Sequence, residues 1–162
     1  MASIITEYRG KRIDNGEWVY GGLVTCPISN ACWIYYPDPD MTDTEVVDLG
    51  LRRIEVHPES VGMYTGLKDT EGVKIFQKDI IRKVAGVYNS LDEGIPYVVK
   101  FGTHETTTDY YASTAYGWFV EFRETIDHCF STDCILEGLK GEAKGVKVVG
   151  NITDNPNMIE SK

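Results

Sequence analysis

The chain has no run of apolar residues that approaches the roughly 20 residues of a membrane-spanning helix. It also shows no secretory signal at its start, where the sequence MASIITEYRGKR places its charges after a short apolar patch, the reverse of a signal peptide. We therefore expect a soluble protein of the cytoplasm.

Positive charge is scarce. The sequence holds 16 Lys and Arg against 25 Asp and Glu, which gives a formal net charge of −9. A dedicated nucleic-acid binder draws its affinity from Lys and Arg that neutralise phosphates, so this balance argues against that class. The basic residues cluster only at Arg9–Lys11–Arg12 and Arg52–Arg53. We interpret both clusters as solvated ends of edge strands, because charged edges hinder aggregation.

Cysteines are few, and their spacing is unlike that of a zinc site. They stand at positions 26, 32, 129 and 134, as C-x5-C and C-x4-C. Structural zinc sites usually pair their ligands as C-x2-C to C-x4-C, so one pair is too wide and the other lies at the limit. Disulfides are rare in a reducing compartment. We expect buried or half-buried thiols, no bound zinc, no disulfide and no cofactor.

Helical periodicity is almost missing, and alternation of apolar and polar residues takes its place. β-branched and aromatic residues between Gly, Asn, Asp and Pro predict a mainly β fold. One or two short helices are expected, near residues 43–49 with Thr42 as N-cap and near 133–139. The segments that we expect to form strands are residues 16–25, 31–37, 51–58, 79–86, 95–102, 116–122 and 146–152.

The glycine-rich segment VGMYTGLKDTEGVKIFQKDI, residues 61–80, lacks the spacing of a phosphate-binding loop. Its core, LKDTEGVKI, predicts two strands joined by a charged turn that Gly72 closes with a positive φ. Gly62 and Gly66 would permit bulges. Asp79 is placed to accept hydrogen bonds from the backbone of the turn before it.

Three segments of the chain stand out together. The first is RGKRIDNGEWVYGGLV, the second is ESVGMYTGLKDTEGVKIFQKDI, and the third is VVGNITDNPNMI. Together they resemble the YopX proteins, which phages and prophages of bacteria encode. They are similar to the family's opening, central and closing motifs. One position departs from the family pattern, because Gln77-Lys78-Asp79 stands where the family usually has Glu-Gly-Asp. The turn glycine is therefore lost, and either this position does not need a positive φ or the turn differs.

The resemblance implies a β-rich protein with two subdomains, residues 1–73 and 74–162, although a single compact unit is also compatible with it. It implies that the second is a small Src-homology-3-like barrel in the cytoplasm of a bacterial host. We expect the last strand, VKVVGNI, to pair within the barrel that KIFQKDI begins. Trp18, Tyr64 and Phe76 are expected core residues, and Asn155-Pro156 is expected to end the last strand.

No catalytic residues come with the resemblance, and the sequence by itself predicts no enzyme. Cys129 adjoins His128, with Asp127 and Asp133 near, but adjacent residues on a strand point to opposite faces. The acidic segment 38–48 does not fit the twelve-residue calcium loop. We interpret it as a solvated loop, and whether it binds a cation stays open.

The functional prediction is an accessory protein that binds another protein, of the host or the phage, or binds itself as a homo-oligomer. Small barrels commonly bind through shallow aromatic grooves. The alternative is a small β-barrel that binds nucleic acid by stacking bases on aromatic rings, for which the basic partners are few. The aromatic residues predicted to line an interaction surface are Trp33, Tyr35, Tyr36, Tyr110 and Tyr111.

Overall fold

The computed structural model describes residues 7–37, 50–86, 91, 93–107, 112–121, 130–131 and 145–159. The chain divides into two compact units, Met1–Tyr64 and Thr65–Lys162. This division falls within the strand Gly62–Lys68, whereas the sequence analysis placed a boundary after residue 73, in the turn that follows this strand. The two predicted helices, 43–49 and 133–139, lie outside the described residues.

The mainly β class is confirmed, and each of the seven predicted strand segments overlaps a strand. The helical turns of the described residues are two short 3-10 turns, η1 (Pro58–Ser60) and η4 (Pro156–Met158). The strands are β1 (Tyr8–Lys11), β2 (Trp18–Thr25), β3 (Cys32–Pro37), β4 (Leu51–Val56), β5 (Gly62–Lys68), β6 (Lys74–Phe76), β7 (Asp79–Lys83), β8 (Tyr97–Thr107), β9 (Ala112–Glu121), β10 (Phe130–Ser131) and β11 (Val146–Asn151).

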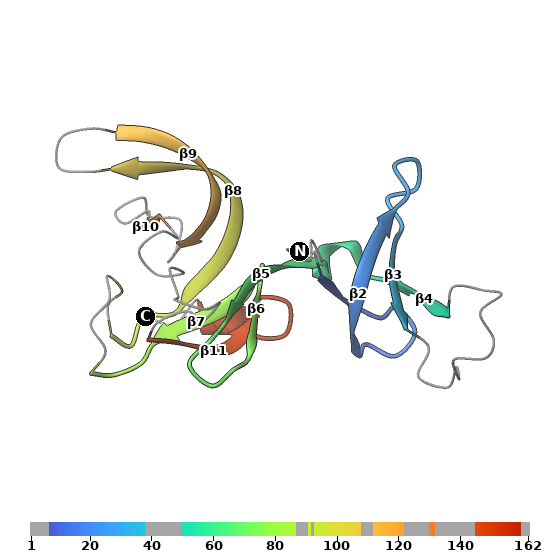
Figure 1. The fold of residues 1–162 in the computed structure, drawn as a ribbon, viewed down its shortest axis with the longest axis horizontal. Helices are drawn as coiled ribbons and strands as arrows, with labels where there is room; N and C mark the ends of the chain where they lie inside the picture. Colours follow the sequence, from blue (N-terminus) through green and yellow to red (C-terminus); the bar gives the residue numbers. More distant parts are fainter. Residues whose placement is uncertain are drawn as a thin grey trace. The chain divides into compact units, whose positions relative to one another are not determined.

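In the first unit the antiparallel strands follow the order β4-β3-β2-β1 (Figure 1). The end of β4 returns to the end of β1, where Arg12 and Val56 form an isolated bridge. The N–H of His57 donates to the carbonyl of Lys11 at 2.9 Å, and the N–H of Ile13 donates to the carbonyl of Glu55 at 3.2 Å. The sheet therefore curls until its first and last strands meet, which gives it an inner and an outer face.

The inner face of this sheet holds the core of the first unit. Strand alternation sends every second side chain inward, and the fully packed positions are Cys32, Ile34 and Val56. Gly10 permits the close approach of β1 to β4, because a Cβ at this position would lie 2.7 Å from a methyl carbon of Val56. The partly buried residues that complete the cluster are Tyr8, Val19, Leu23, Ile54 and Val61.

In the second unit the strands follow the order β10-β9-β8-β7-β11. β11 pairs with β7, with Gly150 opposite Ile80 and Asn151 opposite Asp79. The part of the prediction that pairs VKVVGNI with a strand of the half that KIFQKDI begins is therefore confirmed. The described pairings form an open row, so closure into a Src-homology-3-like barrel stays a prediction. The buried core of the second unit consists of Ile75, Ile81, Leu91, Tyr97, Val99, Val120 and Val146.

The turns of the glycine-rich segment follow the sequence prediction. Gly72 has a φ of +83° and closes the turn between β5 and β6. Asp79 accepts a hydrogen bond from the backbone N–H of Phe76 at 2.7 Å. Lys78 has a φ of +73°, so the left-handed conformation persists at the position where the family usually has glycine. The first of the two alternatives, that this position does not need a positive φ, is therefore wrong.

Candidate interaction surface

The outer face of the first unit carries a row of aromatic side chains. Residues directly opposite each other in antiparallel strands point to the same face, so the register of β1 to β4 defines this face. We call it the outer face; its members on β2, β3 and β4 are Trp18, Tyr20, Gly22, Val24, Trp33, Tyr35, Pro37, Leu51, Arg53 and Glu55.

Two rows of residues cross β2, β3 and β4 on the outer face. In the first row, Tyr35 lies between Gly22 and Arg53. In the second row, Trp33 lies between Val24 and Glu55. Each row therefore presents an aromatic ring in its centre and a charged side chain on β4.

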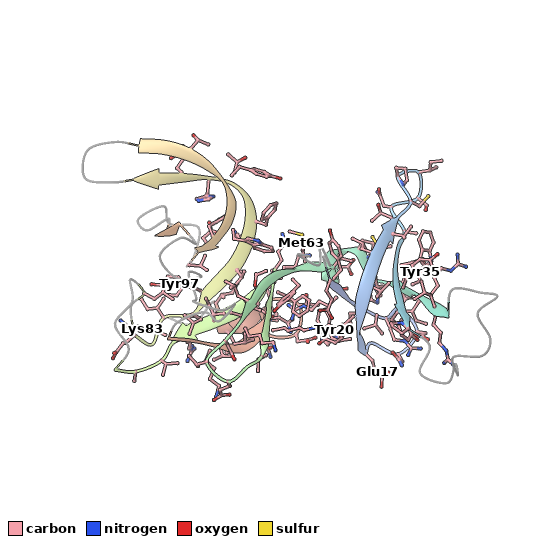
Figure 2. All side chains as sticks on the ribbon, viewed as in Figure 1. Glu17, Tyr20, Tyr35, Met63, Lys83 and Tyr97 are labelled. Carbon is pink, nitrogen blue, oxygen red and sulfur yellow. The ribbon has the colours of Figure 1, made fainter. Side chains whose placement is uncertain are left out.

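Gly22 leaves a gap in this row of side chains. A Cβ built on Gly22 meets no atom within 4 Å, and the position is exposed. Along β2 the gap is flanked by Tyr20 and Val24, which are 46 % and 49 % exposed. Tyr35 bounds it on β3 (Figure 2 labels Tyr20 and Tyr35). The surroundings of Gly22 are thus apolar and open to a side chain from another molecule.

Charge at the outer face is of both signs. The guanidinium of Arg53 lies 5.8 Å from the centre of the Trp33 ring, within cation–π range. Within the described residues, Arg53 has no carboxylate partner, and its side chain is exposed. Glu55 is also exposed, and its position is two residues further along β4. Arg9 differs from Arg53, because it lies over Trp18 at 4.8 Å and is buried.

The predicted surface residues divide into three groups. Trp33 and Tyr35 lie half-buried on the outer face. Tyr36 follows Tyr35 directly, so the alternation of side chains along β3 turns it to the opposite face. There it lies opposite Arg52 of β4. Tyr110 and Tyr111 lie outside the described residues.

Of the three predicted core residues, the prediction is right for Phe76 and wrong for Trp18. Phe76 is buried in the second unit, whereas Trp18 lies half-buried on the outer face. Tyr64 is half-buried. The sequence alone suggested no binding role for Tyr20, Gly22 or Arg53. Only the register across β2, β3 and β4 brings them beside Tyr35.

A second group of rings lies on the hairpin of β8 and β9. Phe101 contacts Tyr116 edge to face, with ring centres 5.2 Å apart, and contacts Trp118 at 4.9 Å. Tyr116 is 75 % exposed. Trp118 also packs against the buried core of the second unit, so this group is part of the packing of β8 and β9 on that core.

The described thiols are Cys26, which is half-buried, and Cys32, which is buried, and both are free. A hydrogen bond from the Ser29 side chain lowers the pKa of the Cys26 thiol, and burial raises the pKa of the Cys32 thiol. Among the residues that the structure describes, no three His, Cys, Asp or Glu side chains gather as a metal site. The group His128–Cys129, the cysteine at 134 and the acidic segment 38–48 lie outside these residues.

The surface thus belongs to a mostly β protein that presents a curled sheet with an aromatic outer face. The chain belongs to the YopX protein family, whose model matches residues 7–160. No curated protein matches the chain. A solved structure that is similar is the crystal structure of protein EF1440 from Enterococcus faecalis, with 20 % sequence identity and a TM-score of 0.44, covering 97 % of this chain and 99 % of that one. In the described part of the chain, no helix has the length and apolar character needed to cross a membrane.

Proposed function

We propose that this protein is a phage or prophage accessory protein that acts in the host cytoplasm by binding another protein through the outer face of its first unit. The observation that carries the proposal is the open gap above Gly22, bounded by the apolar side chains of Tyr20, Val24 and Tyr35. Rigid aromatic side chains give a large contact area at a small entropic cost, which is why they dominate protein interfaces.

The position of the outer face supports a binding role over a purely structural one. The core of this unit lies on the inner face, around Ile34 and Val56, so the rings of Trp33 and Tyr35 are not needed to fill it. Tyr20 and Val24 are each about half exposed, and they lie on the same face of β2, on either side of Gly22. Neighbouring exposed apolar residues on a sheet mark an interaction site more often than scattered ones do.

Site-specific photocrosslinking tests this proposal in cells that carry the phage or prophage. A benzophenone amino acid is introduced at Tyr35, at Tyr20 and, as a matched control on another exposed ring, at Tyr116. We expect a protein adduct of one defined mass from Tyr35 and Tyr20, and not from Tyr116. No adduct from either outer-face position would contradict the proposal, and adducts with nucleic acid alone would establish the alternative function.

A further inference from the structure

The charges on β4 narrow the class of partner that the outer face accepts. Arg53 and Glu55 occupy alternate positions of one strand, so their side chains leave the same face about 7 Å apart. Arg53 stands in the row of Gly22 and Tyr35, and Glu55 stands in the row of Trp33. A partner that lies along β4 therefore meets a positive and then a negative charge.

A nucleic acid does not fit this pattern. Its backbone carries one negative charge at every nucleotide, so a strand that placed a phosphate at Arg53 would bring the next ones toward Glu55. The chain as a whole carries a net charge of −9, which adds long-range repulsion. An extended polypeptide can carry both signs of charge at neighbouring positions, and it can also fill the gap above Gly22 with an apolar side chain.

Resting on the proposed function, we infer that the outer face binds an extended segment of a partner protein that carries an acidic and a basic residue on alternate positions. The acidic side chain pairs with Arg53, and the basic side chain pairs with Glu55. Gly22 lies two strands from Arg53 in the same row, so a large apolar side chain of the same segment reaches across Tyr35 to the space above Gly22. Arg53 is held over the Trp33 ring, so less of its side-chain freedom is lost on binding.

The experiment starts from a random-peptide display library selected on the full chain. We expect enriched sequences to contain a large apolar residue together with an acidic and a basic residue at alternate positions. A synthetic peptide of the enriched sequence is then titrated by fluorescence anisotropy against the wild type and Gly22→Trp. Because the tryptophan fills the gap, binding should weaken by about 30-fold or more, as at interface hot spots. The thermal midpoint of Gly22→Trp should not fall, since a Cβ at this position meets no other atom within 4 Å.

A charge exchange gives the second readout. The double variant Arg53→Glu with Glu55→Arg keeps the composition and the net charge, and it reverses the order of the two signs. It should prefer a peptide with its acidic and basic residues exchanged, by about tenfold over the original peptide. The wild type should show the opposite preference and bind the original peptide more tightly than the exchanged one.

The outcomes separate this inference from the proposed function. If the enriched peptides bind wild type and Gly22→Trp equally, or if the charge exchange changes no preference, the inference is wrong while photocrosslinked protein adducts at Tyr35 still support the proposed function. If oligothymidylate binds the wild type with a steep salt dependence and competes with the peptides, the inference is wrong as well. If selection yields no peptide, the outer face does not bind extended segments, and the inference is overturned.

Discussion

The carboxylate of Asp69 accepts a hydrogen bond from the backbone N–H of Val148 at 2.9 Å, which joins two residues that lie 79 positions apart in the sequence. Its other oxygen accepts hydrogen bonds from the backbone N–H groups of Glu71 at 2.8 Å and Val73 at 2.9 Å. Asp69 is 1 % exposed. One buried side chain therefore satisfies both the turn after β5 and the backbone of β11.

Replacement of Asp69 by Ala should be among the most destabilising changes in the second unit. It leaves three backbone N–H groups without their acceptor, in a site that solvent barely reaches, and we expect a loss of about 3 kcal/mol in the free energy of unfolding. Urea denaturation followed by tryptophan fluorescence measures this loss. Glu71→Ala is the matched control. Glu71 lies in the same turn as Asp69, and its replacement removes only an exposed ion pair with Lys147 of β11, so the effect should be far smaller. Equal losses for the two variants would contradict the assigned role of Asp69.

Replacement of Lys78 by Gly should stabilise the protein. Lys78 has a φ of +73°, and the left-handed conformation costs an L-residue about 1–2 kcal/mol. Since glycine loses more entropy on folding, a net gain of about 1 kcal/mol is expected. Gly72→Ala tests the cost of a positive φ in the opposite direction. This position has a φ of +83° and open space for a methyl group, so only the backbone conformation opposes the alanine. Thermal unfolding should show a higher midpoint for Lys78→Gly and a lower midpoint for Gly72→Ala. A lower midpoint for Lys78→Gly would contradict the claim that the positive φ of Lys78 costs stability.

Two adjacent glycines of β2 should respond differently to the same substitution. A Cβ at Gly21 would lie 2.0 Å from the carbonyl oxygen of Tyr35, and backbone atoms cannot move aside easily. Gly21→Ala should therefore cost about 3 kcal/mol or more, whereas Gly22→Ala should change stability by no more than about 0.5 kcal/mol. Chemical denaturation of the two variants in parallel measures the difference. Similar midpoints would mean that β2 and β3 do not approach each other as described.

Replacement of Ser60 by Ala should weaken the join between β1 and the chain that runs from β4 to β5. The Ser60 hydroxyl accepts a hydrogen bond from the backbone N–H of Lys11 at 2.7 Å and donates one to the carbonyl of His57 at 2.6 Å. Ser60 is buried, so the variant leaves the Lys11 N–H unsatisfied and should lose about 1–3 kcal/mol. Hydrogen exchange at Lys11 should accelerate. Ser29→Ala, in an exposed turn, is the control, and unchanged exchange at Lys11 would contradict the assignment.

The thiols of Cys26 and Cys32 should differ in reactivity. The hydrogen bond from Ser29 lowers the pKa of Cys26, so a larger fraction of this thiol is the reactive thiolate at a given pH. Burial raises the pKa of Cys32 and also limits access. Alkylation by iodoacetamide, followed by peptide mass spectrometry over a range of pH, should show Cys26 reacting first, with its midpoint at the lower pH. Ser29→Ala should move the Cys26 midpoint upward; a midpoint that stays in place would exclude Ser29 as the cause.

The sequence by itself determined the mainly β class, the strand segments and the turn chemistry of this protein. Alternation of apolar and polar residues is a local pattern, so it located residues 16–25 and 146–152 as strands without knowledge of their partners. The positive φ of Gly72 and the hydrogen bond of Asp79 with Phe76 are likewise local, because they depend on a few neighbouring residues.

The tertiary structure alone decided which residues share a surface. Gly22, Tyr35 and Arg53 come from three strands, and only the pairing register places them in one row. A shift of one residue would send Tyr35 to the inner face, and nothing in the local pattern of a single strand fixes its register with another. The position of Trp18 was misjudged for the same reason, since a large apolar ring fits a core and an aromatic surface equally well until its strand acquires partners.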